Sequence, residues 1–393
     1  MDLFWGTLLI LLLPVAALSG WWVARRGGGR GQRPVAEVRI PPEYLAGLNY
    51  VLNEEQDKAI DLFIKLLEVD NQTVETHLAL GNLFRRRGEV DRAIRIHQNL
   101  IARPKLGAEH RALALLELGT DYMRSGLLDR AEGLFNELVD KDAHAEAALR
   151  ALLDIYQQEK DWLKAVAVSR RLESATGERF GPEIAQFHCE LADEACKRGD
   201  YSAARQRLQD ALENDRNCAR ASLIEAGICR LERQPAAAIA AYKRVGRQDP
   251  NYLPEVTGPL LECYREIGRL PEYRDYLREV VGTIGGITPL LCLTSLTEEL
   301  EGRNAAAALL TAELDRRPAV RGVHRLVEYA MAVADGELQR SLNAIRQMTE
   351  RLIQGKSVYQ CQHCGFAAKS LHWKCPGCKS WNSIKPVFGV EGE

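Results

Sequence analysis

Two patterns of apolar residues divide the chain into parts. Residues 3–24, LFWGTLLILLLPVAALSGWWVA, contain no charged side chain. From about residue 40 to residue 354, apolar residues instead recur with helical spacing between charged ones, and short turns separate the helical stretches. The first pattern predicts a segment surrounded by lipid. The second predicts a long series of helices, each of which buries one face.

The uncharged run predicts a transmembrane anchor at residues 1–24. As a helix the run is about 33 Å long, enough to cross a bilayer core of about 30 Å. The run ends at Trp21 and Trp22, and aromatic residues are common where such helices meet the membrane surface. A cleaved signal peptide is the alternative, but only Met1 and Asp2 precede the run, and a signal peptide needs positive charge there.

Basic residues follow the predicted span, in the segment RRGGGRGQR. By the positive-inside rule this order places residues 25–393 in the cytoplasm. We therefore expect a single-pass protein of the inner membrane if the host is bacterial. Residues 25–39 form a basic, glycine-rich linker, which predicts a flexible tether whose arginines can contact anionic lipid.

The helical part repeats at intervals of about 34 residues, as between Gly47 and Gly81. One small residue in the second helix of each unit follows the same period. It is found at Ala59, Ala93, Ala131, Ala165, Ala204, Ala238 and Ala307, and the larger Tyr273 takes its place once. A period of 34, with small residues where two helices cross closely, is the tetratricopeptide repeat pattern. We predict an all-α superhelical array at residues 40–354, with about eight repeats and a terminal helix pair.

The array predicts a binding protein and not an enzyme. Such arrays hold partner segments in a groove, although this inference rests on fold class alone. The sequence contains no phosphate-binding loop, no G-x-S-x-G and no H-E-x-x-H motif. A formal net charge of −2 gives no basic field, so we expect no nucleic acid as a partner.

The ten cysteines fall into two groups that do not suit a disulfide framework. Four lie within residues 361–378. The other six are scattered singly through the helical part, at Cys189, Cys196, Cys218, Cys229, Cys263 and Cys292. We interpret the six as small, mostly buried side chains in a reducing compartment, and a regulatory thiol among them stays open.

The clustered cysteines form two C-x-x-C pairs, Cys361 with Cys364 and Cys375 with Cys378. Each pair can direct two thiolates at one ion, and four thiolates suit tetrahedral zinc or a single iron. A redox-active or disulfide pair is the alternative. The intervening GFAAKSLHWK has room for one short hairpin. We predict a rubredoxin-like zinc ribbon at residues 358–388 that is too small to fold without its metal.

The surroundings of the cysteine pairs carry further expectations. We expect Phe366, Trp373 and Trp381 to pack around the two pairs, and His363 and His372 to be exposed. Only QGKSV separates the last predicted helix from the ribbon. A linker that short lacks the reach for independent movement, so we expect the ribbon to dock against the array.

An N-terminal span, a tetratricopeptide array and a C-terminal four-cysteine module, in this order, resemble the LapB (YciM) family of lipopolysaccharide assembly proteins. The resemblance covers essentially the whole chain and rests on FWGTLLILLLP, the repeats above and YQCQHCGFAAKSLHWKCPGCKSW. It implies that Cys361, Cys364, Cys375 and Cys378 hold one iron or zinc ion.

The resemblance also implies a function. Members of this family look like membrane-anchored adaptors that promote degradation of the deacetylase LpxC by the membrane protease FtsH. An anchor confines the search for a membrane protease to two dimensions, and a groove raises the effective concentration of the substrate beside it. Two alternatives stay open: a scaffold that gathers lipopolysaccharide assembly proteins without a role in proteolysis, and a metal-dependent redox or nucleic-acid-binding module mounted on the array.

Overall fold

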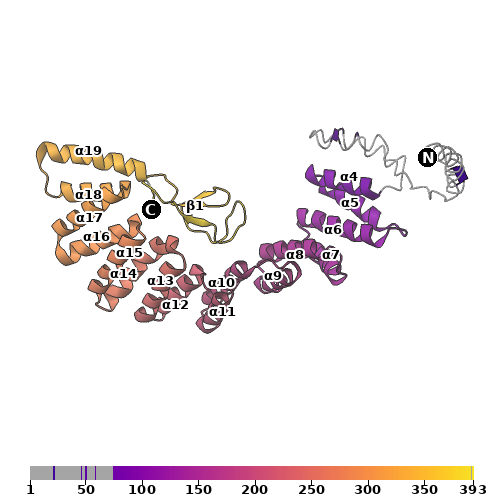
Figure 1. Cartoon of the computed structure of the whole chain (residues 1–393), viewed down its shortest axis with the longest axis horizontal. Coiled ribbons are helices and arrows are strands. Elements are labelled where there is room, and N and C mark those ends of the chain that lie inside the picture. The colour runs from indigo at the N-terminus through magenta and orange to yellow at the C-terminus, as the bar shows by residue number, and fades with distance from the viewer. Residues whose placement is uncertain (1–20, 23–45, 47–48, 51–57, 59–73, 391) are drawn as a thin grey trace, which may run out of the picture. The chain divides into compact units, whose positions relative to one another are not determined.

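The computed structural model describes residues 21–22, 46, 49–50, 58, 74–390 and 392–393 (Figure 1). The chain divides into two compact units, Met1–His110 and Arg111–Glu393. The predicted anchor at residues 1–24 and the linker at residues 25–39 lie outside the described residues, apart from two tryptophans. No helix within the described part is both long enough and apolar enough to cross a bilayer.

Helices joined by short turns make up residues 74–353, which confirms the prediction of an all-α repeat array for this part of the chain. In the first unit, α4 (Val74–Arg86) and α5 (Val90–Ile101) form a helical hairpin, and α6 (Ala108–Arg124) begins there and continues into the second unit. The helices that follow are α7 (Leu128–Asp140), α8 (Ala145–Glu159), α9 (Trp162–Thr176), α10 (Gly181–Lys197), α11 (Tyr201–Asn214), α12 (Ala219–Leu231), α13 (Pro235–Gln248), α14 (Leu253–Glu266), α15 (Leu270–Thr283), α16 (Ile287–Glu301), α17 (Arg303–Arg316), α18 (Val320–Met331) and α19 (Gly336–Ile353).

The repeated small position is buried in the second helix of each described pair up to α17. It is fully buried at Ala93, Ala131, Ala165, Ala204, Ala238 and Tyr273. In α17 the prediction of Ala307 is wrong by one residue, because Ala306 is the fully buried alanine. Four consecutive alanines leave this register open in the sequence. Packing decides it, since Ala306, Leu310 and Leu314 are spaced four apart and share the buried face.

Glycines mark the two close helix crossings that the sequence pattern predicts most clearly. A Cβ atom placed on Gly119 of α6 would lie 2.6 Å from the ring of Phe135 on α7, which is fully buried. A Cβ atom on Gly81 of α4 would collide with the ring of His97 on α5. Any side chain at either position would therefore force the two helices apart.

We predict opposite effects for alanine at two neighbouring glycines. Gly119→Ala gains about 1 kcal/mol of helix propensity but overpacks the crossing by about 1–3 kcal/mol, so the protein should lose stability. Gly133→Ala is the matched control: this glycine lies in α7, is exposed, and has no atom near its Cβ position. It should gain roughly 0.5–1 kcal/mol. Urea unfolding followed by circular dichroism measures both, and equal shifts would contradict the close crossing.

The C-terminal module is a small antiparallel sheet of β1 (Tyr359–Cys361), β2 (Ala367–Ala368) and β3 (Ile384–Pro386), in the order β2–β1–β3. Tyr359 pairs with Ala368 on one side and with Pro386 on the other. The predicted hairpin within GFAAKSLHWK is therefore wrong in its register. The hairpin closes instead around the first cysteine pair, because β2 finds its partner in the residues just before that pair.

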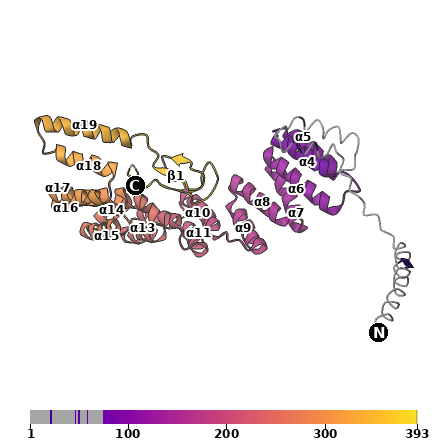
Figure 2. The same cartoon turned by 45° about the horizontal axis from the view of Figure 1, so that its top comes forward.

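The ribbon, defined here as residues 359–386, lies against helices α10 to α13 in both views of the structure (Figures 1 and 2). It follows α19 after a short linker, as predicted, and turns back onto helices that precede it by more than a hundred residues.

Candidate metal centre

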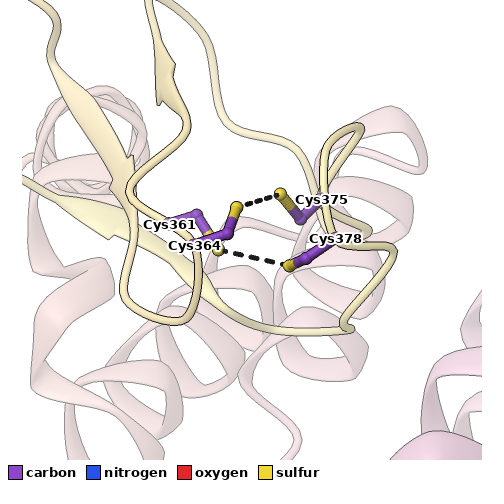
Figure 3. A group of neighbouring side chains, drawn as sticks. All are labelled: Cys361, Cys364, Cys375 and Cys378. Atoms are coloured by element: carbon purple, nitrogen blue, oxygen red, sulfur yellow. Dashed lines mark hydrogen bonds between the residues drawn. The ribbon is translucent and has the colours of Figure 1, made fainter. Parts of the chain in front are cut away.

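Two loops of the ribbon bring the four cysteine sulfurs together (Figure 3). All four sulfur atoms lie within 4.8 Å of one another. The sulfurs of Cys361 and Cys378 are 3.7 Å apart, and those of Cys364 and Cys375 are 3.6 Å apart. A tetrahedral ion with metal–sulfur bonds of about 2.3 Å requires sulfur–sulfur distances of about 3.8 Å. Two pairs already match this distance and no pair exceeds 4.8 Å, so the four sulfurs fit a single tetrahedral ion after shifts of at most about 1 Å.

The two C-x-x-C pairs form equivalent turns. In the first, the amide of Gly365 donates to the carbonyl of Cys361 at 3.0 Å; in the second, the amide of Lys379 donates to the carbonyl of Cys375 at 2.9 Å. The residue that closes each turn has a positive φ, 77° at Gly365 and 64° at Lys379. Glycine adopts this conformation without strain, which is why a small residue suits the first turn. The turns aim both thiols of each pair inward.

Hydrogen bonds around the sulfurs favour thiolates at Cys361 and Cys378. The hydroxyl and the amide of Ser380 lower the pKa of Cys378 to about 5. Burial raises the pKa of Cys361, but hydrogen bonds from Ser383 and from two backbone amides outweigh it and lower the pKa overall. The amide of Phe366 lowers the pKa of Cys364, but hydrogen bonds with the other three sulfurs raise it to about 11. Adjacent thiolates repel each other without a counter-ion, and a cation at the centre would allow all four sulfurs to ionise.

The aromatic residues near the pairs do not all lie where the sequence predicts. His363 and His372 are exposed, as expected. Phe366 is 37% exposed, so it is not buried against the pairs. Trp373 and Trp381 pack against aromatic rings of the array. Their indole rings supply the ribbon's main apolar contact with the array, which a short local pattern could not reveal.

Trp381 docks between two aromatic rings of the array. Its ring centroid lies 5.9 Å from that of Trp162 on α9 and 5.8 Å from that of Phe187 on α10, both in edge-to-face geometry. Its indole nitrogen donates to the side-chain oxygen of Gln157 on α8 at 2.9 Å. Edge-to-face contacts add about 0.5–1.5 kcal/mol each beyond burial. Trp381 is thus held at three points.

Trp373 makes a second aromatic contact next to the first. Its ring centroid lies 5.0 Å from that of Tyr252, a fully buried residue just before α14. The guanidinium of Arg220 lies 5.6 Å from the Trp373 ring. Arg220 is itself buried and paired with Glu190 and Asp193 of α10, so it presents a fixed cation to the ring.

A buried lysine fixes the far end of the ribbon. The ammonium of Lys385 on β3 donates to Asp249 at 2.6 Å, to the hydroxyl of Tyr252 at 2.9 Å and to Asn382 at 3.0 Å. The hydroxyl of Tyr252 in turn donates to Asn382 at 2.6 Å. Burial lowers the pKa of Lys385, and its bond to Asp249 acts against this shift. All three donor positions of the ammonium are therefore used.

We predict that Lys385→Met weakens ribbon docking by about 2 kcal/mol, the value of hydrogen bonds to a charged group. The loss stays moderate because Asp249 keeps its bonds with Asn251 and is partly accessible to water. Limited proteolysis of the linker at residues 354–358 measures the docking. Lys369 is an exposed lysine of the same ribbon, so Lys369→Met is the control. Its linker should be cleaved at the same rate as that of the unmodified protein.

Comparisons with known proteins agree with this architecture. A family model described as a rubredoxin metal binding domain matches residues 359–386, and tetratricopeptide repeat models match residues 76–111, 116–178 and 189–252. The chain is 40% identical to lipopolysaccharide assembly protein B of Escherichia coli (strain K12) over 386 residues, which cover 98% of this chain and 99% of that protein. The chain belongs to the lipopolysaccharide assembly protein B (LapB) family.

Other similarities point the same way or concern the repeats alone. A LapB family member from Haemophilus influenzae is 38% identical over 394 residues, covering 98% of this chain and 99% of that protein. A crystal structure of a tetratricopeptide repeat protein from Parabacteroides merdae is 13% identical with a TM-score of 0.31, and covers 71% of this chain and 99% of that one. The family assignment rests on the two relatives that match along nearly their whole length, from Escherichia coli and Haemophilus influenzae.

Sequence analysis did not predict which residues of this LapB family member hold the ribbon against the array. Gln157, Arg220, Asp249 and Tyr252 lie in ordinary-looking helical stretches. Beyond them, Glu393 accepts from the backbone amide of Thr288 at 3.0 Å and from other groups on α16 and α18, so the last residues also hold to the array. No spacing rule connects residues this far apart, so only the folded structure could identify them.

A cleft of about 920 Å³ lies beside the docked ribbon. The ribbon contributes the second cysteine pair, Lys374 and Trp381, and the array contributes side chains from α6, α8 and α10. Two carboxylates line it: desolvation raises the pKa of Asp154, and burial raises the pKa of Glu183, which has one carboxylate oxygen without a hydrogen-bond partner. Burial also lowers the pKa of Lys374. The cleft thus holds partly desolvated charges on both of its walls.

Proposed function

We propose that this protein is a membrane-anchored cytoplasmic adaptor that regulates lipopolysaccharide synthesis by promoting degradation of LpxC by FtsH. The observation that carries the proposal is the docking of a four-cysteine ribbon onto a repeat array, which joins a metal centre and a binding scaffold in one body. Membership of the LapB family supports a role in lipopolysaccharide assembly, and the uncharged run at residues 3–24 supports the anchor.

In this proposal Cys361, Cys364, Cys375 and Cys378 hold one zinc or iron ion whose role is structural. When bound, the ion supplies four bonds that cross-link the two turns of the ribbon. The chain's own residues do the rest: Trp373 and Trp381 attach the ribbon to the helices, and Lys385 fixes its last strand. The metal state then decides whether the cleft beside the ribbon exists at all.

We propose the cleft as a contact site for a partner segment. Glu183 and Lys374 are partly buried there, Asp154 is exposed, and none of the three has a direct ion pair among the described residues. Charged groups with shifted pKa values that gather in a cleft are a feature of binding sites. A segment with polar and charged side chains would satisfy them. Both walls are needed, so recognition requires the docked ribbon as well as the repeats.

The ribbon lysines give little support to a nucleic-acid-binding role. Lys385 is buried in its contact with Asp249, and Lys374 lies over the ring of Trp381 with its pKa lowered by burial. Lys385 is therefore committed to the interface and Lys374 faces the cleft, which leaves Lys369 and Lys379 as the exposed lysines of the ribbon. Phosphate binding requires a larger cluster of free positive charge.

The test is the half-life of LpxC in cells that contain this protein, lack it, or carry Cys375→Ser. We expect LpxC to become long-lived on depletion and with the serine variant alike. Deleting residues 1–24 should also lengthen the half-life although the rest of the protein folds, because the array is no longer confined beside the protease. The double variant Asp154→Asn with Glu183→Gln tests the cleft, since it keeps the shape of the side chains.

Two outcomes would redirect the proposal. An LpxC half-life that does not change on depletion would overturn the proteolysis role and favour the scaffold that gathers lipopolysaccharide assembly proteins. If the protein without residues 1–24 still shortens the half-life of LpxC fully, confinement to the membrane is not needed for its function.

A further inference from the structure

Two of the scattered cysteines are in direct contact in the folded protein. The sulfur of Cys189, on α10, lies 3.7 Å from the sulfur of Cys218, the residue just before α12. Both side chains are almost completely buried. The two thiols thus come from the first helices of two consecutive repeats and face each other. Within the described residues, no other thiol pair outside the ribbon has a sulfur–sulfur contact of this kind.

The surroundings of the pair distinguish its two sulfurs. Cys218 precedes the first turn of α12, where the amide of Ala221 points at its sulfur, and the side-chain amide of Gln186 donates to it at 3.6 Å. The guanidinium of Arg220 is also near. The hydrogen bond with Cys189 and the amide of Ala221 lower the pKa of Cys218 in spite of its burial. The same hydrogen bond and burial raise the pKa of Cys189.

We propose that Cys189 and Cys218 form an oxidation site, at which a peroxide converts the two thiols into a disulfide. In the first step the Cys218 thiolate attacks one peroxide oxygen, which forms a sulfur–oxygen bond and breaks the oxygen–oxygen bond. In the second step the Cys189 sulfur attacks the sulfenic acid and displaces its oxygen as water. Overall, two thiols and one hydrogen peroxide give one disulfide and two waters.

The geometry suits the bond. A disulfide is about 2.05 Å long, so the two sulfurs must approach by roughly 1.7 Å. Cys218 is the N-cap residue of α12, so its carbonyl takes part in the first turn of the helix, but its side chain can rotate about the Cα–Cβ bond while the backbone stays in place. The bond would join α10 to the start of α12 and thereby fix two neighbouring repeats to each other. The proposal is independent of the adaptor role.

Two side chains connect the thiol pair to the ribbon. Gln186 contacts both Cys218 and Arg220, whose guanidinium packs against Trp373 of the ribbon. Movement of Cys218 toward α10 would displace Gln186 and, two residues along the chain, Arg220. Oxidation is therefore expected to disturb the contact of Trp373 with the array.

The experiment treats the purified full-length protein, loaded with zinc, with limiting hydrogen peroxide. Remaining thiols are then alkylated, and the digest is analysed by mass spectrometry. We expect the loss of two thiols per chain, a linked peptide pair containing Cys189 and Cys218, retention of zinc, and reversal by dithiothreitol. Tryptophan fluorescence should change together with the disulfide and return with it.

Matched variants separate the pair from the other thiols. Cys229→Ser and Cys263→Ser change buried cysteines that have no sulfur neighbour within the described chain, and both proteins should still form the link. Cys189→Ala should leave Cys218 as a sulfenic acid that dimedone traps, whereas Cys218→Ala should trap nothing at Cys189. Loss of zinc before any link forms, or random pairing of the scattered cysteines, would overturn the proposal.

Discussion

Cys375→Ser is expected to unfold the ribbon and abolish metal binding, while the helices of the array stay folded. Cys375 is fully buried and its sulfur lies 3.6 Å from that of Cys364, so its loss opens one corner of the tetrahedron. The sheet of the ribbon has three strands of two or three residues each, which is too little to fold alone. Structural zinc contributes about 10–16 kcal/mol to modules of this size.

The measurement combines metal content with tryptophan fluorescence. Trp373 and Trp381 are packed against the helices, so an unfolded ribbon exposes both and shifts their emission to longer wavelength. A strong chelator should do the same to the unmodified protein. Cys263→Ser is the control, because Cys263 is buried in α14, away from the four sulfurs, and should leave metal and fluorescence unchanged. Full metal occupancy of Cys375→Ser would contradict the four-sulfur site.

Trp381→Ala is expected to release a folded, metal-loaded ribbon from the array. The substitution removes the two edge-to-face contacts with Trp162 and Phe187 and leaves the side-chain oxygen of Gln157 without its donor. Truncation of a well-packed tryptophan costs about 3–5 kcal/mol. This cost falls on docking and not on the metal site, since these three contacts are all with residues of the array.

Limited proteolysis of residues 354–358 reports the release, and metal content shows that the ribbon itself survives. Cleavage should become faster while the metal stays bound. Phe366→Ala is the matched control, because Phe366 is an exposed aromatic residue of the same ribbon and its loss should leave cleavage unchanged. If Trp381→Ala loses its metal, or if the linker is cleaved at the unmodified rate, the ribbon is held by other contacts.

Much of the fold could be predicted because its signals are local. The small positions such as Ala131 and Ala165 recur at a fixed period, and each becomes buried against the helix next to it. The four cysteines could be identified for the same reason. The three-residue step within each pair sets the turn, and the turn aims both sulfurs at one point. The LapB family could be recognised from the order of these parts.

Contacts between distant parts of the chain needed the folded structure. Trp381 and Gln157 are 224 positions apart, and Lys385 and Asp249 are 136 apart, so no local pattern could pair them. The sequence predicted that the ribbon docks, from the length of its linker, but placed its tryptophans around the metal. The contact of Cys189 with Cys218 was equally hidden, because each looked like an ordinary buried residue.

Within the described residues, the sequence by itself determined that the chain folds into a series of repeated helices and which four sulfurs converge. These features depend on spacing within one helix pair or one turn, where a few bonds fix the geometry. The tertiary structure alone decided which side of the ribbon meets the array, which alanine of α17 is buried and which two scattered thiols touch. These depend on how side chains fill the space between elements far apart in the chain, and that is settled by packing.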